Sequence, residues 1–413
     1  MSVSTTGEGP GKRSGRRFGL ALAGGGPLGG IYEVGVLAAL DEALEGIDLH
    51  EMEVYVGVSA GAFIASNLAN GFSTDQIARI FISADSRAHP IGRWVFMTPA
   101  WREYIRRVRR LPRAVTATVW DMLRHPIDKG FFGALTNFTR VIPTGVFDNA
   151  PVEHFLADLY QTRGHTNDFR ELTRKLFVVA ADIDTGESVR FGAPGHDHVP
   201  ISKAIQASTA LPGLYPPVEI DDRYYVDGAL KRTLHASVAL DEGVDLLLCI
   251  NPIVPYDANL ADDDDRRKKH SRLINGGLPT VLSQTFRSVI HSRMNVGIKS
   301  YESTYGNRDI VLFEPDREDS RMFFANLFSY SNRRRVCEHG YQTTRRDLLN
   351  NYDQLSVLFA RHGISLRRDV LEDPERHFDT NMHVPRDVSR RGLYKNEVTN
   401  RLSEALDRLR QKV

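Results

Sequence analysis

The residues between Met52 and Gly71 limit what this chain can fold into more than any other stretch. Alternating apolar side chains from Met52 to Val56 predict a short buried strand. The small apolar residues from Ala60 to Ala69 predict a packed helix that ends at Gly71. A strand followed so closely by a helix leaves room only for a sharp turn, and Ser59 occupies that turn.

Ser59 is flanked by Gly57 and Gly61 in the pattern Gly-x-Ser-x-Gly. This pattern lets a strand bend sharply into a helix and holds the serine in a strained, exposed conformation. The helix N-terminus behind Ser59 favours negative charge on its oxygen or on a bound carbonyl group. We therefore predict a nucleophile elbow with Ser59 as the nucleophile. A purely structural tight turn is the alternative, because so short a pattern also arises by chance.

The composition narrows the class of protein. Of 413 residues, 41% are hydrophobic and 25% are charged, which is usual for a globular protein with a buried core. The formal net charge of +1 gives no general argument for a nucleic-acid partner. The two cysteines, Cys249 and Cys337, are too few for a disulfide framework or a zinc site. We expect no metal, no organic cofactor and no nucleic acid.

The sequence gives no strong targeting signal. No stretch reaches the roughly 20 apolar residues that a membrane-spanning helix needs. The apolar run 18–23 follows two arginines like an export signal, but it ends in three glycines and is too short for a signal core. We expect a cytoplasmic, peripherally membrane-associated protein without a cleavable signal peptide or transmembrane helix. Residues 1–16 are predicted to be a disordered tail.

A glycine loop at residues 24–30 follows a predicted strand from Phe18 to Ala23 and precedes a helix with apolar residues at helical spacing from Ile31 to Leu44. The loop fits Gly-x-Gly-x-x-Gly, the fingerprint of dinucleotide-binding proteins. That fingerprint requires an acidic residue at the end of the second strand, where this chain has Ser59. We therefore interpret the loop as an oxyanion hole that faces Ser59. A nucleotide site and a tight turn without function are the alternatives.

The segment 85–144 mixes basic with aromatic residues and contains all three tryptophans. Arginine, tryptophan and phenylalanine at helical spacing are typical of helices that lie on anionic lipid, so we interpret this segment as an interfacial lid. A solvated basic face over an aromatic core explains the same residues equally well. A nucleic-acid patch is a weaker third interpretation.

Later strands complete the predicted core. Continuous apolar runs predict strands at 176–183 and 245–250, with a helix at 201–210 between them. Asp227 ends another short strand and is followed by Gly228. Strands that alternate with helices predict an α/β fold, a three-layer sandwich with a mainly parallel central sheet and a helical C-terminal extension.

We divide the chain after the last of these strands. The division gives a tail at 1–16, a catalytic domain at 17–255 with the basic aromatic insert, and a mainly helical C-terminal extension at 256–413. In this extension, amphipathic patterns predict helices at 278–298 and 334–359 and a basic tail at 397–413. The sequence assigns the extension no chemistry.

Three features follow one another along the chain: the glycine loop, Gly57-Val58-Ser59-Ala60-Gly61 and Asp227-Gly228-Ala229. In this order they resemble the signature of the patatin-like phospholipases, over residues 18–255. The resemblance implies a catalytic dyad of Ser59 and Asp227 that works without a histidine. It also implies an oxyanion hole formed by amides of the loop, which we assign to Gly24, Gly25, Gly26 and Gly29.

One position departs from the family pattern. Members often have Arg or Lys before the last glycine of the loop, where this chain has Leu28, preceded by Pro27. The register of the loop is therefore open, and so is the choice of amides that form the hole.

The resemblance implies a serine lipid acyl hydrolase, similar to phospholipase A, that cleaves phospholipid or another acyl-ester lipid at a membrane surface. A homo-oligomer remains open. One alternative is a non-catalytic lipid-binding or membrane-recruited protein with the same fold. Another is an α/β-hydrolase with a Ser-Asp-His triad, whose histidine would be His235, His270, His291 or His339.

Overall fold

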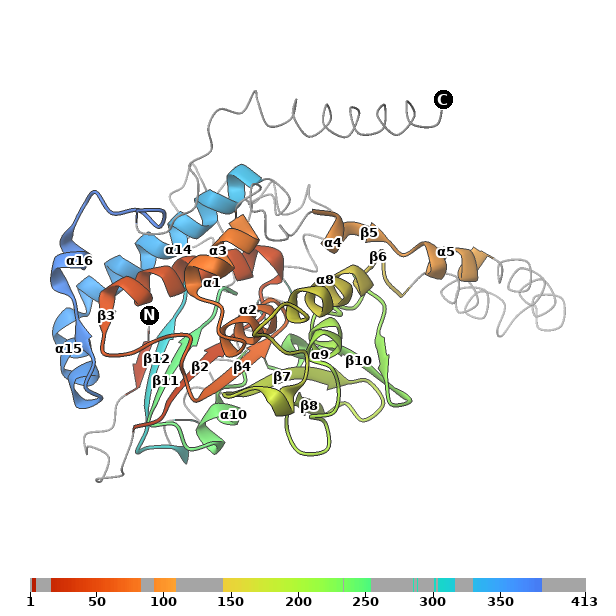
Figure 1. The fold of residues 1–413 in the computed structure, drawn as a ribbon, viewed down its shortest axis with the longest axis horizontal. Helices are drawn as coiled ribbons and strands as arrows, with labels where there is room; N and C mark the ends of the chain where they lie inside the picture. Colours follow the sequence, from red (N-terminus) through yellow and green to blue (C-terminus); the bar gives the residue numbers. More distant parts are fainter. Residues whose placement is uncertain are drawn as a thin grey trace, which may run out of the picture.

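A central β-sheet between layers of helices forms the body of the protein (Figure 1). The computed structural model describes residues 2–4, 16–82, 93–108, 144–232, 234–253, 285, 288, 301, 304–315 and 330–380. Within these ranges the main sheet has nine strands in the order β1-β12-β11-β2-β4-β7-β10-β9, with β8 also paired to β7. Their bounds are β1 Ser2–Ser4, β2 Phe18–Leu22, β4 Val54–Val58, β7 Lys175–Asp182, β8 Ser188–Phe191, β9 Val218–Ile220, β10 Arg223–Asp227, β11 Leu246–Ile250 and β12 Asp309–Phe313.

The five central strands, from β12 to β7, run parallel, and strands at the two edges run antiparallel. In this register Leu22 of β2 pairs with Gly57 of β4, and Val58 of β4 pairs with Val179 of β7. Because the carboxyl ends of parallel strands meet at one edge, the segments that follow β2 and β4 lie side by side.

Helices cover both faces of the sheet. The described helices have the bounds α1 Gly26–Ala43, α2 Ala60–Ala69, α3 Thr74–Ile82, α4 Arg93–Met97, α5 Trp101–Val108, α8 Ala150–Tyr160, α9 Ile201–Ser208, α10 Ala236–Asp241, α14 Tyr330–Asn350, α15 Tyr352–Arg361 and α16 Arg368–Glu372. Two small antiparallel pairs join β3 Leu44–Glu45 with β13 Ser365–Leu366, and β5 Thr98–Pro99 with β6 Phe147–Asp148.

The side chains of β2 show how the sheet divides the core. Leu20 and Leu22 belong to the larger hydrophobic cluster, which also takes residues from α1, α2 and α14. Ala21 belongs to a smaller cluster with residues of α10. Successive side chains of a strand point to opposite faces, so one strand contributes to two separate cores. The predicted fold class, a three-layer α/β sandwich with a mainly parallel sheet and helices near the C-terminus, is confirmed.

Some predicted elements differ from the observed ones. The helix after the glycine loop begins at Gly26, ahead of the apolar pattern from Ile31, because Pro27 suits the first turn of a helix. The region predicted as one helix at 334–359 forms α14 and α15, which are separated at Asn351. The predicted helix at 278–298, the tail at 397–413 and most of the segment 85–144 lie outside the described residues.

Residues outside the segment 17–255 contribute to the sheet. β12 pairs in parallel with β11, and β1, near the N-terminus, pairs with β12. α14 packs along α1, where Gly35 and Gly340 bring the two helices into close contact. The proposed domain boundaries remain a prediction. Among the helices described, none is both long and apolar enough to cross a membrane.

Candidate active site

Ser59 lies in a strained turn between β4 and α2. Its backbone has φ 54° and ψ −123°, in the left-handed region that side chains rarely adopt. A Cβ atom at Gly57 would lie 2.4 Å from Ala62 Cα, and one at Gly61 would lie 2.5 Å from the Leu22 carbonyl oxygen. Both glycines are therefore required because backbone passes directly against them.

Ser208, at the C-terminal end of α9, holds the backbone of this turn. The Ser59 N–H donates to Ser208 Oγ at 2.8 Å, and the Ser208 hydroxyl donates to the Val179 carbonyl oxygen at 2.6 Å. The bridge ties Ser59 to the neighbouring strand β7 and helps to hold its unusual φ. Sequence analysis missed Ser208, because no pattern links residues 149 positions apart.

Asp227 lies beside Ser59 across β7. It pairs with Ala180 in the antiparallel β10–β7 register, one residue beyond the Val179 that pairs with Val58. The Ala229 N–H donates to Asp227 Oδ1 at 2.9 Å, and the Ser59 side chain lies close enough to the Asp227 carboxylate to lower its pKa. Burial has the larger effect and raises the pKa of Asp227 to about 6, against the opposing effects of the Ala229 N–H and of Ser59.

The glycine loop packs against Ser59 and against the segment that follows Asp227. A Cβ atom at Gly24 would lie 3.1 Å from Ser59 Cβ and 3.0 Å from Ala229 Cβ, so the loop backbone passes close to both. Gly26 has φ +63° and opens α1, where the first N–H groups of a helix have no partner within the helix.

The other glycines of the loop have different surroundings. The Gly29 N–H donates to the Gly25 carbonyl oxygen at 3.1 Å, as a turn of α1 requires. Cβ atoms at Gly25 and Gly29 would each lie within 3 Å of Pro252 Cγ, which limits both positions to glycine. Leu28 is buried in the larger core, 4% exposed. Of the four glycines assigned to the oxyanion hole, Gly29 thus has its amide engaged in the helix.

Two of the histidines suggested for a triad are described, and each has contacts of its own. His235 precedes α10 and hydrogen-bonds the backbone of Gly228, and burial lowers its pKa to about 4. His339, on α14, packs against the ring of Tyr32. Neither is among the groups that shift the pKa of Asp227. His270 and His291 lie outside the described residues.

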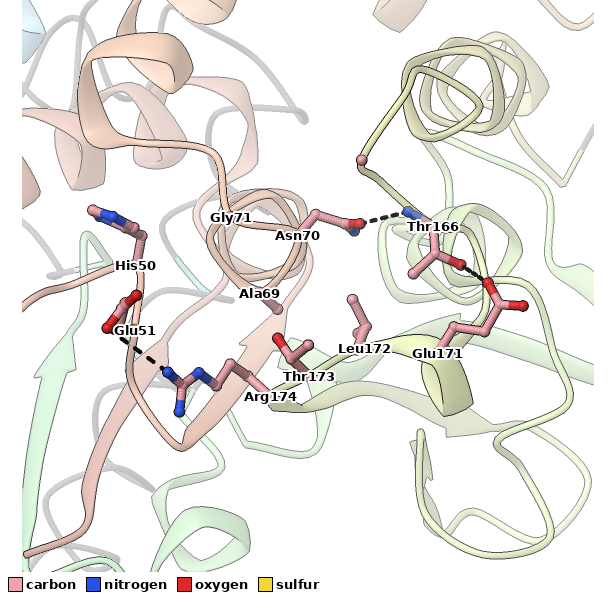
Figure 2. Close-up of a pocket in the computed structure, with 11 residues that line it drawn as sticks. His50, Glu51, Ala69, Asn70, Gly71, Thr166, Glu171, Leu172, Thr173 and Arg174 are labelled. Carbon is pink, nitrogen blue, oxygen red and sulfur yellow. Dashed lines mark hydrogen bonds and ion pairs between the residues drawn. The ribbon is translucent and has the colours of Figure 1, made fainter.

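A cavity of about 340 Å³ lies at the other end of α2 (Figure 2). Asn70 and Gly71, just after that helix, line it, whereas Ser59 precedes the first residue of the helix. Asn70 Oδ1 accepts from the Thr166 N–H at 2.8 Å, and Glu51 and Arg174 pair at 3.8 Å. Residues 60–68 of α2 separate this cavity from Ser59, so it is not part of the Ser59–Asp227 site. Within the described ranges no three His, Cys, Asp or Glu side chains are grouped to hold a metal ion.

Comparison with known proteins adds to this geometry. The sequence model of the patatin-like phospholipase family matches residues 20–240. An uncharacterised NTE family protein of Mycobacterium tuberculosis is 29% identical over 241 residues, which are 58% of this chain and 30% of that protein. An uncharacterised protein of Acanthamoeba polyphaga mimivirus is 24% identical over 75% of this chain and 86% of its own length. Among solved structures, VipD from Legionella pneumophila is similar with a TM-score of 0.39 and 18% identity, over 81% of this chain and 67% of VipD.

The strained serine between two glycines, the adjacent buried aspartate and the glycine loop beside the serine thus come together in the fold. The family match covers more than half of the chain and includes all three features. The chain belongs to the patatin-like phospholipase family, a family of lipid hydrolases. The matched segment spans about a third of the length of the mycobacterial relative.

Proposed function

We propose that this protein is a serine lipid acyl hydrolase that cleaves acyl esters of membrane lipids, as a phospholipase A does. The observation that carries the proposal is the position of the Ser59 side chain beside the buried Asp227 carboxylate, whose pKa it lowers. A serine needs an adjacent base to become a nucleophile, and Asp227 is the carboxylate beside it. Its raised pKa makes it a better proton acceptor than an ordinary aspartate.

The reaction follows from this arrangement. Asp227 removes the Ser59 proton while Oγ attacks the ester carbonyl carbon, and N–H groups near Gly25 and Gly26 stabilise the oxyanion. Collapse of the tetrahedral intermediate breaks the ester bond, and Asp227 returns the proton to the departing alcohol. Water, activated by Asp227, then attacks the acyl-enzyme and releases the fatty acid. Ser59 recovers its proton.

A peripheral membrane surface is the proposed place of action. Trp101 on α5 is 64% exposed and Ile105, one turn later, is 52% exposed. Val146, whose carbonyl oxygen accepts from the Ala100 N–H and the Tyr104 hydroxyl, is 46% exposed. Large apolar side chains exposed together indicate an interaction surface, and a lipid layer is the substrate source for such an enzyme.

The test is fatty-acid release from mixed phospholipid vesicles. We expect Ser59→Ala to lower kcat by at least about 10⁴-fold. We expect Asp227→Asn to lower it by about 10²- to 10⁴-fold, because it removes the base and keeps the shape. Ser356→Ala is the matched control, since Ser356 is a half-buried serine on α15 and its loss should leave kcat unchanged.

Two results would contradict the proposal. A folded wild-type protein that releases no fatty acid, with or without anionic lipid, would favour the non-catalytic lipid-binding alternative. Activity that survives Ser59→Ala would place the chemistry at another group.

A further inference from the structure

Pro252 follows β11 and packs against the glycine loop. A Cβ atom at Gly25 would lie 2.6 Å from Pro252 Cγ, and a Cβ atom at Gly29 would lie 2.9 Å from the same carbon. Gly25 directly precedes α1 and Gly29 lies in its first turn, so the proline ring touches both ends of the segment that carries the proposed oxyanion-hole amides. Gly24, the residue before Gly25, contacts Ser59 instead. The loop is thus packed between Ser59 and Pro252.

Hydrogen bonds to the sheet fix the backbone that leads into Pro252. The Ala23 N–H donates to the Ile250 carbonyl oxygen at 3.0 Å, which ties the end of β11 to the end of β2. The Asn251 N–H donates to the Phe313 carbonyl oxygen at 2.9 Å, which ties the same segment to β12. Proline has a fixed φ and also restricts the residue before it to extended conformations. The proline ring is therefore held in place relative to the sheet.

The Asn251 side chain closes a turn around Pro252. Asn251 is fully buried, and its Oδ1 accepts from the Ile253 N–H at 3.1 Å. Its Nδ2 donates to the Ile253 carbonyl oxygen, also at 3.1 Å. An asparagine that bonds the backbone two residues further on forms an Asx turn, and the residue between the two is held by it. These bonds add a second constraint on the orientation of the ring.

Gly29 shows that the contact with Pro252 decides which residue the loop accepts. Its φ lies outside the left-handed region, so its backbone conformation does not require glycine. Apart from the backbone of α1 itself, the atoms of the described residues within 4 Å of a Cβ atom at position 29 are Pro252 Cγ and Pro252 Cβ. Alanine would favour the helix more than glycine does. The sequence therefore has a weaker helix former at this position, and the proline ring lies close to the loop.

We propose that Pro252 is a positioning residue for the oxyanion loop. This inference rests on the proposed function. Amides that stabilise an oxyanion act only if they are held within a fraction of an ångström of the reacting oxygen. A run of glycines has no side chains to anchor it, and its backbone is freer than that of any other residue. The rigid ring of Pro252 gives this backbone a fixed surface to pack on, at Gly25 and again at Gly29.

A double-mutant cycle between Pro252 and Gly29 tests the proposal. We expect Pro252→Ala to lower kcat about 10- to 100-fold with little change in KM, because the loop loses the surface it packs on. Gly29→Ala should also lower kcat, because its methyl group pushes against the ring. In the double variant the methyl group takes the space of the lost ring atoms, so kcat should return to within about threefold of wild type. Wild-type kcat in a folded Pro252→Ala variant, or additive losses in the double variant, would overturn the proposal.

Gly35→Ala, further along the same helix, is the matched control. A Cβ atom at Gly35 would meet the Cys337 carbonyl oxygen and not Pro252. Gly35→Ala should lower Tm, and it should not restore the kcat of Pro252→Ala. Recovery of kcat in that pair would contradict a specific contact between Pro252 and the loop. Loss of kcat in proportion to Tm across all these variants, as ordinary core defects would give, also contradicts a positioning role.

A second measurement does not depend on hydrolysis. Hydrogen–deuterium exchange of the peptide that covers residues 20–30 should be faster in Pro252→Ala than in wild type. In the double variant with Gly29→Ala it should return close to the wild-type rate. Unchanged exchange in Pro252→Ala overturns the inference whether or not the protein releases fatty acid. Faster exchange in Pro252→Ala, with no fatty-acid release by wild type, would overturn the proposed function and leave the contact between Pro252 and the loop standing.

Discussion

The Ser208 side chain helps to hold the backbone of Ser59 in its strained conformation. We predict that Ser208→Ala lowers the free energy of unfolding by about 1–3 kcal/mol, because the buried N–H of Ser59 loses its acceptor. It should also lower kcat, since the elbow loses the bridge to Val179. Denaturant unfolding and esterase kinetics measure the two effects. Ser202→Ala, on the same helix and equally buried, should lower stability without lowering kcat. Wild-type kcat in Ser208→Ala would show that the turn at Ser59 keeps its active conformation without the Ser208 hydrogen bonds.

The raised pKa of Asp227 predicts opposite pH trends for activity and stability. The base must be ionised, so kcat/KM should rise with pH through about 6 and level off above 7. Between the unfolded pKa near 3.8 and the folded value near 6, the native state keeps a proton that the unfolded state has lost. The free energy of unfolding should therefore fall by about 3 kcal/mol as pH rises through this window.

Asp227→Asn isolates this effect, because asparagine does not titrate. Denaturant unfolding at pH 4 and pH 7.5 should show a smaller loss of stability in Asp227→Asn than in wild type. Equal pH dependence in both proteins would mean that Asp227 has an ordinary pKa and is more solvated than its burial indicates.

At the scale of single elements, α5 is the feature with the clearest functional consequence. In Figure 1 it lies beyond α4 and β5, away from the central sheet. We predict that the double variant Trp101→Ser, Ile105→Ser binds phospholipid vesicles at least about tenfold more weakly, because two large apolar side chains no longer enter the lipid. Vesicle co-sedimentation measures the binding.

Val357→Ser on α15 is the control. It removes an apolar side chain that is 66% exposed and should not change binding. Equal binding by all three proteins would exclude α5 as the lipid-facing element.

Helices and strands could be predicted from the sequence where the residue pattern that specifies them lies within the element itself. α2 was predicted with its observed bounds, Ala60 to Ala69, because small apolar residues run without interruption up to the glycine at position 71. The strand before α2 was also predicted, because apolar side chains alternate clearly between Met52 and Val56. The start of α1 was not, because the glycine loop hides the first turn of the helix. β12 was missed because the chain between residues 253 and 309 offered no sign that a strand would return to the sheet.

The candidate site was predictable only in part, for the same reason. Ser59, Gly57, Gly61 and Asp227 lie in short motifs that a reader of the sequence can find. Ser208 acts through hydrogen bonds that form only when α9 packs onto the sheet. A polar residue inside an apolar helix is visible in the sequence, but whether it faces solvent or the core depends on the whole fold.

At the scale of the whole molecule, α14 is part of the main core rather than an attachment to it. Tyr341 is fully buried in the larger cluster, together with residues of β2 and α2. The backbones of α1 and α14 meet where Gly35 faces the Cys337 carbonyl oxygen. Helices that touch through backbone atoms have no flexible side chains to absorb a change, so this contact couples residues 330–350 to the sheet.

Two glycines on α1 test this coupling. A Cβ atom at Gly35 would lie 2.1 Å from the Cys337 carbonyl oxygen, so Gly35→Ala should push the helices apart and lower the free energy of unfolding by about 1–3 kcal/mol or more. A Cβ atom at Gly30 would lie at least 3.5 Å from its neighbours, so Gly30→Ala should be neutral or stabilise by up to about 1 kcal/mol. Denaturant unfolding, followed by far-UV circular dichroism and tryptophan fluorescence, compares the two. If α14 belongs to one cooperative core, both probes shift together in Gly35→Ala. A first transition confined to part of the signal, with the rest at its wild-type midpoint, would instead show that residues 330–380 unfold as a separate unit.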